Sequence, residues 1–459
     1  MQDHHLQWAP HLMAETFDLL IQNGQVFTPN GLETVDVGVR EGKIAAIGKF
    51  AADQAGTVMP AAGLTVLPGA IDSQVHFREP GLTHKEDLET GTAGAAIGGI
   101  TAIFEMPNTS PNTLTAGDLK AKLTAAKGRA WVDHAFFMGA SDENADQLDQ
   151  LELLPGCAGV KIFMGSSTGS LLVADDETLE HVLRRGRRRV AIHSEDEPRL
   201  RERLALVRDG AHPREHPNWR DVETAVRSTN RLLKIARRAG RRVHVLHVST
   251  ADEMPILAQN KDIATVEVLP HHLTLVAPDC YDRLGTYAQM NPPVRDQRHQ
   301  DGIWAALRAG IVDCIGSDHA PHTREEKERP YPQSPSGMPG VQTLLPLLLD
   351  HMNAGRLSLQ RLVDLTNAGP ARIFNIAGKG RIAIGYDADF SIVDLKAKHT
   401  ITHDWMKTKS GWTPYDGKTV TGWPVATIIR GHIVMRDGQL IDKPLGEPVR
   451  FGETLPVSA

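Results

Sequence analysis

The sequence is poor in cysteine, with only Cys157, Cys280 and Cys314 among 459 residues. The three lie far apart and show no Cys-x-x-Cys spacing, a usage that fits a reducing, cytoplasmic compartment. No apolar run approaches the roughly 20 residues that cross a bilayer. The N-terminal stretch MQDHHLQWAPHLMAETF also lacks the basic start and apolar segment of a signal peptide. The sequence therefore predicts a protein that is neither exported nor embedded in a membrane.

A strong excess of charge is missing as well. The formal net charge is −6, which gives no basic surface for nucleic acid. Internal repeats and low-complexity linkers are absent from the sequence. The chain is 41% hydrophobic and 23% charged, and it is long enough to bury a large core in one large domain plus a smaller one. We therefore expect a globular protein with no nucleic-acid or membrane partner.

Both ends of the chain carry short predicted strands separated by turn signals. Before residue 60, FDLLIQNGQVFTPNG and VDVGVREGKIAAIG contain Asn-Gly and Glu-Gly turns. After about residue 380 the same pattern returns in GYDADFSIVDL and ATIIRGHIVMRDGQLI. We expect the two ends to pair as one discontinuous β-rich domain of residues 1–63 and 376–459.

The middle of the chain, residues 64–375, alternates short apolar strands with amphipathic segments of helical length, as βα units do. Eight such strands separated by helices predict a (β/α)8 barrel. The candidate strands are LTVLPGAI, ITAIFEM, AWVDHAFFM, AGVKIFM, RVAIHS, RVHVLHV, ATVEVLP and IVDCIGS.

Polar residues that can bind metal recur where these strands end. The carboxyl ends of barrel strands meet at the catalytic face, so side chains placed there converge on one mouth. A random distribution would scatter them over helices and loops instead. The sequence therefore predicts a metal site built from five strands, with the residues His76, Lys161, His193, His247 and Asp318.

Two of these residues have alternative interpretations. Lys161 is the only charged residue in the apolar strand GVKIFM, and burying an unpaired ammonium is costly. It either pairs with a buried carboxylate or is a neutral lysine converted to a carbamate, which can bridge two metals. Asp318, in SDHAPHT, either caps the following segment or binds a metal and shuttles protons.

Three further assignments stay open. His244 and His247 in VHVLHVS are three residues apart, so on a strand they point to opposite faces. We expect only one to face the barrel interior and choose His247, which is nearer the strand end. In LPHHLTL, His271 and His272 are alternatives, either of which could support a ligand rather than bind metal. The segment 323–340, rich in charge, proline and glycine, is either a surface connection or a lid.

Taken together along the chain, the sequence motifs resemble those of the amidohydrolase superfamily and, within it, those of the dihydroorotases. The resemblance spans nearly the whole chain and implies a (β/α)8 barrel with a split β-sandwich domain and a zinc centre. It also implies the reversible closure of N-carbamoyl-L-aspartate to L-dihydroorotate in pyrimidine synthesis. The matching segments are PGAIDSQVHFREPGLTHKEDLETGTAGAAIGGITAIFEMPNTSP, AGVKIFMGSSTGSLLV, IHSEDE, VHVLHVST, LPHHLTL, MNPPVR, GSDHAPHT, KGRIAIGYDADFSIVDL and GWPVATIIRGHIVMRDG.

The resemblance implies a role for each strand-end residue. His76 would bind the more buried zinc, and Lys161, as N6-carboxylysine, would bridge both metals. His193 and His247 would bind the second zinc. Asp318 would contact the first and act as base, then as acid. Two zinc ions per subunit are favoured over one.

The resemblance also implies how substrate is held and what the chain assembles with. Arg78, Asn108 and His322 match contacts to the substrate carboxylate, which a planar guanidinium can grip at two oxygens. Asn291 matches a further substrate contact. A homodimer is expected, and some dihydroorotase-like chains assemble with aspartate transcarbamoylase.

The chain departs from the superfamily at one position, because Gln74 stands where the Asp-x-His-x-His motif has its first histidine. The amide oxygen of glutamine is a weaker and harder donor to zinc than imidazole. The other ligands of the first zinc would still number three, which suffices for catalysis. We expect a competent enzyme with Gln74 in the ligand set. The alternatives are a single zinc, a cyclic amide hydrolase of the allantoinase or hydantoinase kind, and a non-catalytic partner of aspartate transcarbamoylase.

Overall fold

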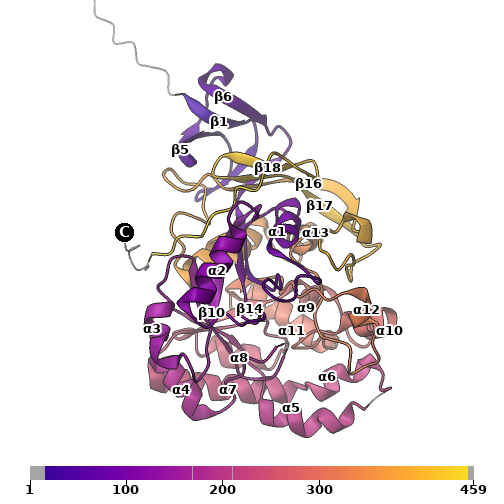
Figure 1. The fold of residues 1–459 in the computed structure, drawn as a ribbon. Coiled ribbons are helices and arrows are strands. Elements are labelled where there is room, and N and C mark those ends of the chain that lie inside the picture. The colour runs from indigo at the N-terminus through magenta and orange to yellow at the C-terminus, as the bar shows by residue number, and fades with distance from the viewer. Residues whose placement is uncertain (1–15, 168, 209, 453–459) are drawn as a thin grey trace, which may run out of the picture.

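The computed structural model describes residues 16–167, 169–208 and 210–452. Most of the N-terminal stretch considered above, residues 1–15, lies outside the described residues. Within these ranges the strands form one eight-stranded parallel sheet and two smaller sheets that contain both chain ends. Figure 1 shows the smaller sheets, in indigo and yellow, stacked on the helix-covered body of the molecule.

The eight-stranded sheet is the predicted barrel. Each strand pairs in parallel with the next. The first and last strands meet through a hydrogen bond of 2.7 Å from His76 N to His319 O. The (β/α)8 prediction is therefore confirmed. The strands are β8 (Ala70–Val75), β9 (Ile100–Glu105), β10 (Asp133–Gly139), β11 (Cys157–Phe163), β12 (Val190–His193), β13 (Val243–Val245), β14 (Ala264–Val268) and β15 (Cys314–Ile315).

Helices follow the strands and begin at residues that cap them. Asp87, Thr115, Asp175 and Asp221 each accept a hydrogen bond from a backbone N–H in the first helical turn. The helices are α1 (Leu88–Ile97), α2 (Ala116–Ala126), α3 (Leu148–Leu151), α4 (Asp176–Arg184), α5 (Glu197–Arg203), α6 (His216–Trp219), α7 (Val222–Ala239), α8 (Glu253–Ala258), α9 (Pro270–Thr274), α10 (Asp279–Leu284), α11 (Gln297–Arg308), α12 (Arg324–Lys327), α13 (Leu344–Asn353), α14 (Leu359–Val363) and α15 (Gly369–Phe374). None of the helices in the described ranges combines the length and apolar character needed to span a bilayer.

Aromatic side chains close the amino-terminal end of the barrel. Phe104 from β9 packs edge to face against Phe374 of α15 and against Phe451 near the C-terminus, with ring centres 5.4 and 5.6 Å apart. Phe137 from β10 joins the same buried cluster. Because this end is filled, the carboxyl ends of the strands form the accessible face, where barrel enzymes carry their sites.

The chain ends form the β-sandwich. Apolar side chains of a four-stranded and a seven-stranded sheet share one buried cluster. The first sheet has the order β5 (Lys43–Gly48), β4 (Asp36–Arg40), β1 (Phe17–Gln22), β6 (Ala55–Pro60). The second has the order β19 (Gln439–Leu440), β18 (His432–Arg436), β17 (Thr419–Ile429), β16 (Phe390–Thr400), β7 (Thr65–Pro68), β2 (Gln25–Thr28), β3 (Gly31–Thr34).

One strand prediction was wrong. The run LTVLPGAI, predicted as one barrel strand, is divided at Gly69 between β7, which pairs with β16 in the sandwich, and β8 in the barrel. A Cβ atom on Gly69 would collide with the Thr101 hydroxyl, so the crossing point requires glycine. Apolar character does not reveal which sheet a strand joins. Within the segment 376–459, Gly446 and Val449 also bond back to Ala130 O and His134 O beside the barrel.

Candidate active site

Three residues beyond barrel strands hold a left-handed backbone. The φ angles of Arg78, His247 and Asp318 are 65°, 41° and 48°. Side chains other than glycine seldom adopt this region, and each such residue costs about 1–3 kcal/mol. Strain of this kind clusters at functional sites, where the surrounding fold maintains it. All three residues line one pocket at the carboxyl ends of the strands.

The same pocket collects most of the residues singled out from the sequence. Among the ten predicted site residues, only His322 does not line it. The segment 323–340, left open above, contributes Ser336 and Gly337 to the pocket wall. The predicted residues that line the pocket are Gln74, His76, Arg78, Asn108, Lys161, His193, His247, Asn291 and Asp318.

His76 and Asp318 face one another as two electron-pair donors. His76 Nδ1 lies 2.8 Å from Asn108 Oδ1, and because that oxygen only accepts, Nδ1 carries the proton. His76 Nε2 lies 3.1 Å from Asp318 Oδ1. Burial lowers the pKa of His76 and favours the neutral ring. A neutral imidazole nitrogen and a carboxylate oxygen at this distance repel one another unless a cation lies close to both, which suits a metal-ligand pair.

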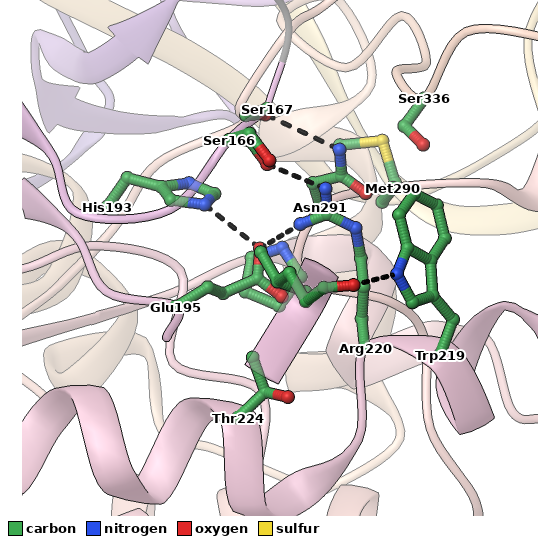
Figure 2. A network of polar contacts seen from close by, with 12 residues as sticks. Ser166, Ser167, His193, Glu195, Trp219, Arg220, Thr224, Met290, Asn291 and Ser336 are labelled. Atoms are coloured by element: carbon green, nitrogen blue, oxygen red, sulfur yellow. Dashed lines mark hydrogen bonds and ion pairs between the residues drawn. The ribbon is translucent and has the colours of Figure 1, made fainter. Parts of the chain in front are cut away.

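His193 and His247 form a second pair. Glu195 Oε2 accepts a hydrogen bond of 2.9 Å from His193 Nε2, so the unprotonated Nδ1 faces His247 Nε2 at 3.0 Å. Figure 2 shows Glu195 between His193 and Arg220. Glu195 and Arg220 form a buried ion pair. Burial opposes the ionisation of Glu195, but Arg220 and His193 lower its pKa to about 2. Carboxylates that orient metal-binding histidines in this way are common. The sequence analysis missed Glu195, although it stands two residues after His193 in IHSEDE.

Lys161 is buried in β11, with Nζ 4.5 Å from the centre of the Phe163 ring. Burial lowers its pKa to about 7, although Asp318 and Glu267 act in the opposite sense. A substantial fraction of Lys161 is therefore a neutral amine at neutral pH, the form that reacts with carbon dioxide.

Gln74 presents an unsatisfied oxygen to the site. Its side chain is 1% exposed, and Oε1 accepts no hydrogen bond from the described residues. A buried amide oxygen without a donor costs about 1–3 kcal/mol, which a cation would relieve. The donors gathered here, imidazole nitrogen and carboxylate and amide oxygen, suit a divalent ion such as zinc.

Comparison with known proteins agrees with this chemistry. The model of the amidohydrolase family matches residues 65–434. The chain belongs to the amidohydrolase family. Proteins of this family are generally metal-dependent hydrolases.

The relatives of this amidohydrolase carry several names. A dihydroorotase of Pyrococcus abyssi is 37% identical, covering 90% of this chain and 94% of its own length, and one of Methanosarcina mazei is 34% identical, covering 93% and 96%. An allantoinase of Escherichia coli is 34% identical, covering 91% and 95%. Among solved structures, L-hydantoinase from Arthrobacter aurescens superposes with a TM-score of 0.89 at 30% identity, covering 95% of this chain and 100% of its own.

A positively charged side chain, that of Arg78, is buried in the pocket wall of this amidohydrolase. The Arg78 side chain is 1% exposed, and Nε donates to Pro321 O at 3.2 Å. No carboxylate of the described residues lies within ion-pair distance of its guanidinium. Burial lowers the pKa of Arg78 to about 10, so the group stays charged at neutral pH. Since an unpaired buried charge is costly, the pocket is suited to an anionic substrate.

His322 lies behind Arg78. It is fully buried, with Nε2 3.2 Å from Arg78 Nη2 and 3.1 Å from Ser336 O. Its Nδ1 lies 3.1 Å from Lys85 Nζ, and since a neutral ring carries one N–H, donation to Ser336 leaves Nδ1 to accept from Lys85. His322 therefore lies next to Arg78 but not among the residues that line the pocket, and its predicted contact with the substrate carboxylate stays a prediction.

Asn291 is oriented by a residue that the sequence analysis missed. His216 Nε2 lies 2.9 Å from Met290 O and 3.1 Å from Asn291 Oδ1. Asn291 Nδ2 points toward Ser167 Oγ, 3.5 Å away (Figure 2). Burial lowers the pKa of His216 to about 3, so the neutral ring donates from Nε2. Asn291 therefore presents its amide N–H groups rather than its oxygen to the pocket. His216 lies in α6, away from any strand end, and no strand-based signal identifies it.

The expectation that only one of His244 and His247 faces inward was wrong. Strand β13 ends at Val245, and the left-handed backbone at His247 breaks the alternation on which that argument depended. His247 lines the pocket, while His244 lies among side chains of β14 and β15 inside the barrel. His271 and His272, both buried, do not line the pocket.

Proposed function

We propose that this amidohydrolase is a dihydroorotase, which reversibly closes N-carbamoyl-L-aspartate to L-dihydroorotate. The observation that carries the proposal is the buried guanidinium of Arg78, which has no carboxylate partner among the described residues. Dihydroorotate has a ring carboxylate that can pair with it, whereas hydantoin and allantoin have none. Dihydroorotases among the relatives, at 34–37% identity over at least 90% of the chain, support the same choice.

The proposal includes a zinc centre. His76, Asp318 and Gln74 would hold one ion, His193 and His247 a second, and a carbamate on Lys161 would bridge them. The chemistry that zinc supplies when bound is the ionisation of water near neutral pH and the polarisation of a carbonyl.

The chain's own groups would then orient substrate and move the proton. Arg78 would grip the carboxylate, while Asn291 donates from Nδ2. Asp318 is suited to proton transfer because it lies in the pocket and remains ionised. Burial opposes its ionisation, but the imidazole groups of His76, His247 and His271 around it hold the pKa of Asp318 below its ordinary value. Asp318 would accept a proton from the attacking water and deliver it to the ring nitrogen that leaves.

The first test is turnover by the purified protein supplied with zinc and bicarbonate. Ring opening of dihydroorotate is measured by the loss of its ultraviolet absorbance. We expect kcat/KM for dihydroorotate to exceed kcat/KM for hydantoin and for allantoin by at least about a hundredfold. Rapid opening of either neutral ring without turnover of dihydroorotate would replace the proposal with the allantoinase or hydantoinase alternative. No turnover of any ring would support a non-catalytic partner of aspartate transcarbamoylase.

Replacement of Gln74 should change zinc binding. In Gln74→Ala the ligand oxygen is lost, and we expect one zinc per chain to dissociate at chelator concentrations at least about tenfold lower than in the wild type. Gln74→His should hold that zinc more tightly, because imidazole is the better donor. Zinc per chain is measured after dialysis against a chelator series. Equal zinc retention in wild type and both variants would show that Gln74 is not a ligand.

The enzyme is also proposed to act in the cytoplasm and to assemble as an oligomer. The three cysteines are free and buried, which fits a reducing cytoplasm. A homodimer and an association with aspartate transcarbamoylase stay predictions, which sedimentation of the purified chain alone and with that enzyme would test.

A further inference from the structure

A second group of metal-binding side chains lies inside the barrel, separate from the residues that line the pocket. His244, Glu267 and Cys314 project from the successive strands β13, β14 and β15, and all three are fully buried. The group lies beneath the active site, since the backbone N–H of His247 donates to Glu267 Oε1 at 3.3 Å. None of the three lines the pocket.

The spacing of the donor atoms fits a metal ion. His244 Nε2 lies 3.5 Å from Cys314 Sγ, and Glu267 Oε2 lies 3.8 Å from both. The centre of a triangle with these sides is about 2.1 Å from each corner, which is close to zinc–nitrogen, zinc–oxygen and zinc–sulfur bond lengths of about 2.0–2.3 Å. The Ser73 hydroxyl, 3.4 Å from Glu267 Oε2, is a further oxygen at the same place.

The histidine is already prepared as a ligand. His244 Nδ1 lies 2.8 Å from Thr265 Oγ1, whose own proton is directed at Val243 O. His244 therefore donates from Nδ1, and its Nε2 presents a lone pair to Cys314 and Glu267. A carboxylate or hydroxyl that fixes the second ring nitrogen is typical of metal-bound histidine.

Hydrogen bonds alone leave this group poorly satisfied. A thiol has one proton, so Cys314 cannot donate to both His244 Nε2 and Glu267 Oε2. The second contact then needs another proton, which the group has only if the buried carboxyl of Glu267 is itself protonated. A divalent ion with one thiolate and one carboxylate forms a neutral unit, which suits complete burial. The mixture of sulfur, nitrogen and oxygen donors favours zinc over magnesium or calcium.

The place of the group gives such an ion a structural task. β15 has only two residues and β13 only three, so few ladder hydrogen bonds hold this side of the barrel. A ligand from each of three neighbouring strands would tie them together directly below the pocket that carries His247 and Asp318. We propose that His244, Glu267 and Cys314 bind a structural zinc ion that joins β13, β14 and β15.

Cobalt substitution tests this site separately from the active site. The residues that line the pocket include no cysteine, so a thiolate-to-cobalt charge-transfer band in the near ultraviolet cannot come from the active site. Its loss in a Cys314 variant would assign it to Cys314 rather than to Cys157 or Cys280. The protein is produced in zinc-depleted medium with cobalt, because a fully buried site fills during folding. We expect the wild type to show this band. The proposal is overturned if folded, cobalt-loaded wild type lacks it.

The metal count provides the second measurement. Zinc-grown Cys314→Ala should contain one zinc per chain fewer than the wild type, and its cobalt form should lose the charge-transfer band. Cys157→Ala is the matched control. Cys157 is also buried in a barrel strand, β11, but it does not belong to the group formed by His244, Glu267 and Cys314. It should keep the wild-type count and band. Equal zinc content in Cys314→Ala and wild type would contradict the proposal whether or not dihydroorotate is turned over.

Discussion

Arg78→Ala is expected to lower kcat/KM for dihydroorotate by about a thousandfold, equivalent to about 4 kcal/mol. The guanidinium is 1% exposed and lies in the pocket without a carboxylate partner from the described residues. Pairing with the substrate carboxylate would therefore be strong, because the buried guanidinium loses little further hydration and its planar group can donate two parallel hydrogen bonds. The loss should appear in both kcat and KM, since the carboxylate also positions the ring.

Two comparisons separate this role from a general loss of structure. Arg78→Lys keeps the charge but cannot form the two parallel hydrogen bonds, so its kcat/KM should lie between those of the wild type and Arg78→Ala. Zinc content should be unchanged in both variants, because the guanidinium is not among the proposed ligands. If Arg78→Ala retained dihydroorotate turnover within tenfold of wild type, the pocket would have to recognise a substrate without a carboxylate.

The location of the site could be predicted from the sequence because barrel topology converts strand order into proximity. His76, Lys161, His193 and Asp318 are distant in the chain, yet each lies within or directly after a short apolar run. Parallel strands in a barrel bring these ends to one face. The prediction needed only the positions of strands and the residue types at their ends, both of which apolar patterning reveals.

The supporting residues could not be predicted in the same way. Glu195, Arg220 and His216 make contacts that form only once loops and helices have packed. Glu195 at least lies next to a strand end, but nothing in the local sequence of Arg220 or His216 distinguishes them from surface residues. The assignment of His244 failed for a different reason. Strand alternation applies only while the backbone stays extended, and the left-handed residue His247 lies beyond the end of β13.

The exchange of strands between sheets marks another limit. β7 and β8 are consecutive in an unbroken apolar stretch, but Gly69 directs one into the sandwich and the other into the barrel. Both strands are fully buried, so hydrophobicity is equal on the two sides of the glycine. Only the three-dimensional pairing with β16 or β9 distinguishes them.

Asp318→Asn should lower kcat for dihydroorotate by about ten thousandfold while leaving KM and zinc content close to wild type. Asparagine keeps an oxygen in the same place as a metal donor, but it cannot accept and release a proton. General acid–base catalysis contributes about a hundredfold to ten thousandfold, and Asp318 is proposed to act in both directions of proton transfer, so the larger figure applies. Steady-state kinetics and zinc analysis on the same preparation provide the two measurements.

Asp313→Asn provides the control, because Asp313 lies before β15 whereas Asp318 lies after it. Asp313 precedes β15, where it pairs with Lys261 and accepts a hydrogen bond of 2.7 Å from Val266 N, outside the pocket. Its loss should reduce thermal stability but leave kcat within about twofold. If Asp318→Asn instead lost zinc together with activity, its main role would be that of a ligand. If Asp318→Asn kept both zinc and activity, another group would have to transfer the proton, and Asp318 would not be the general acid–base of the reaction.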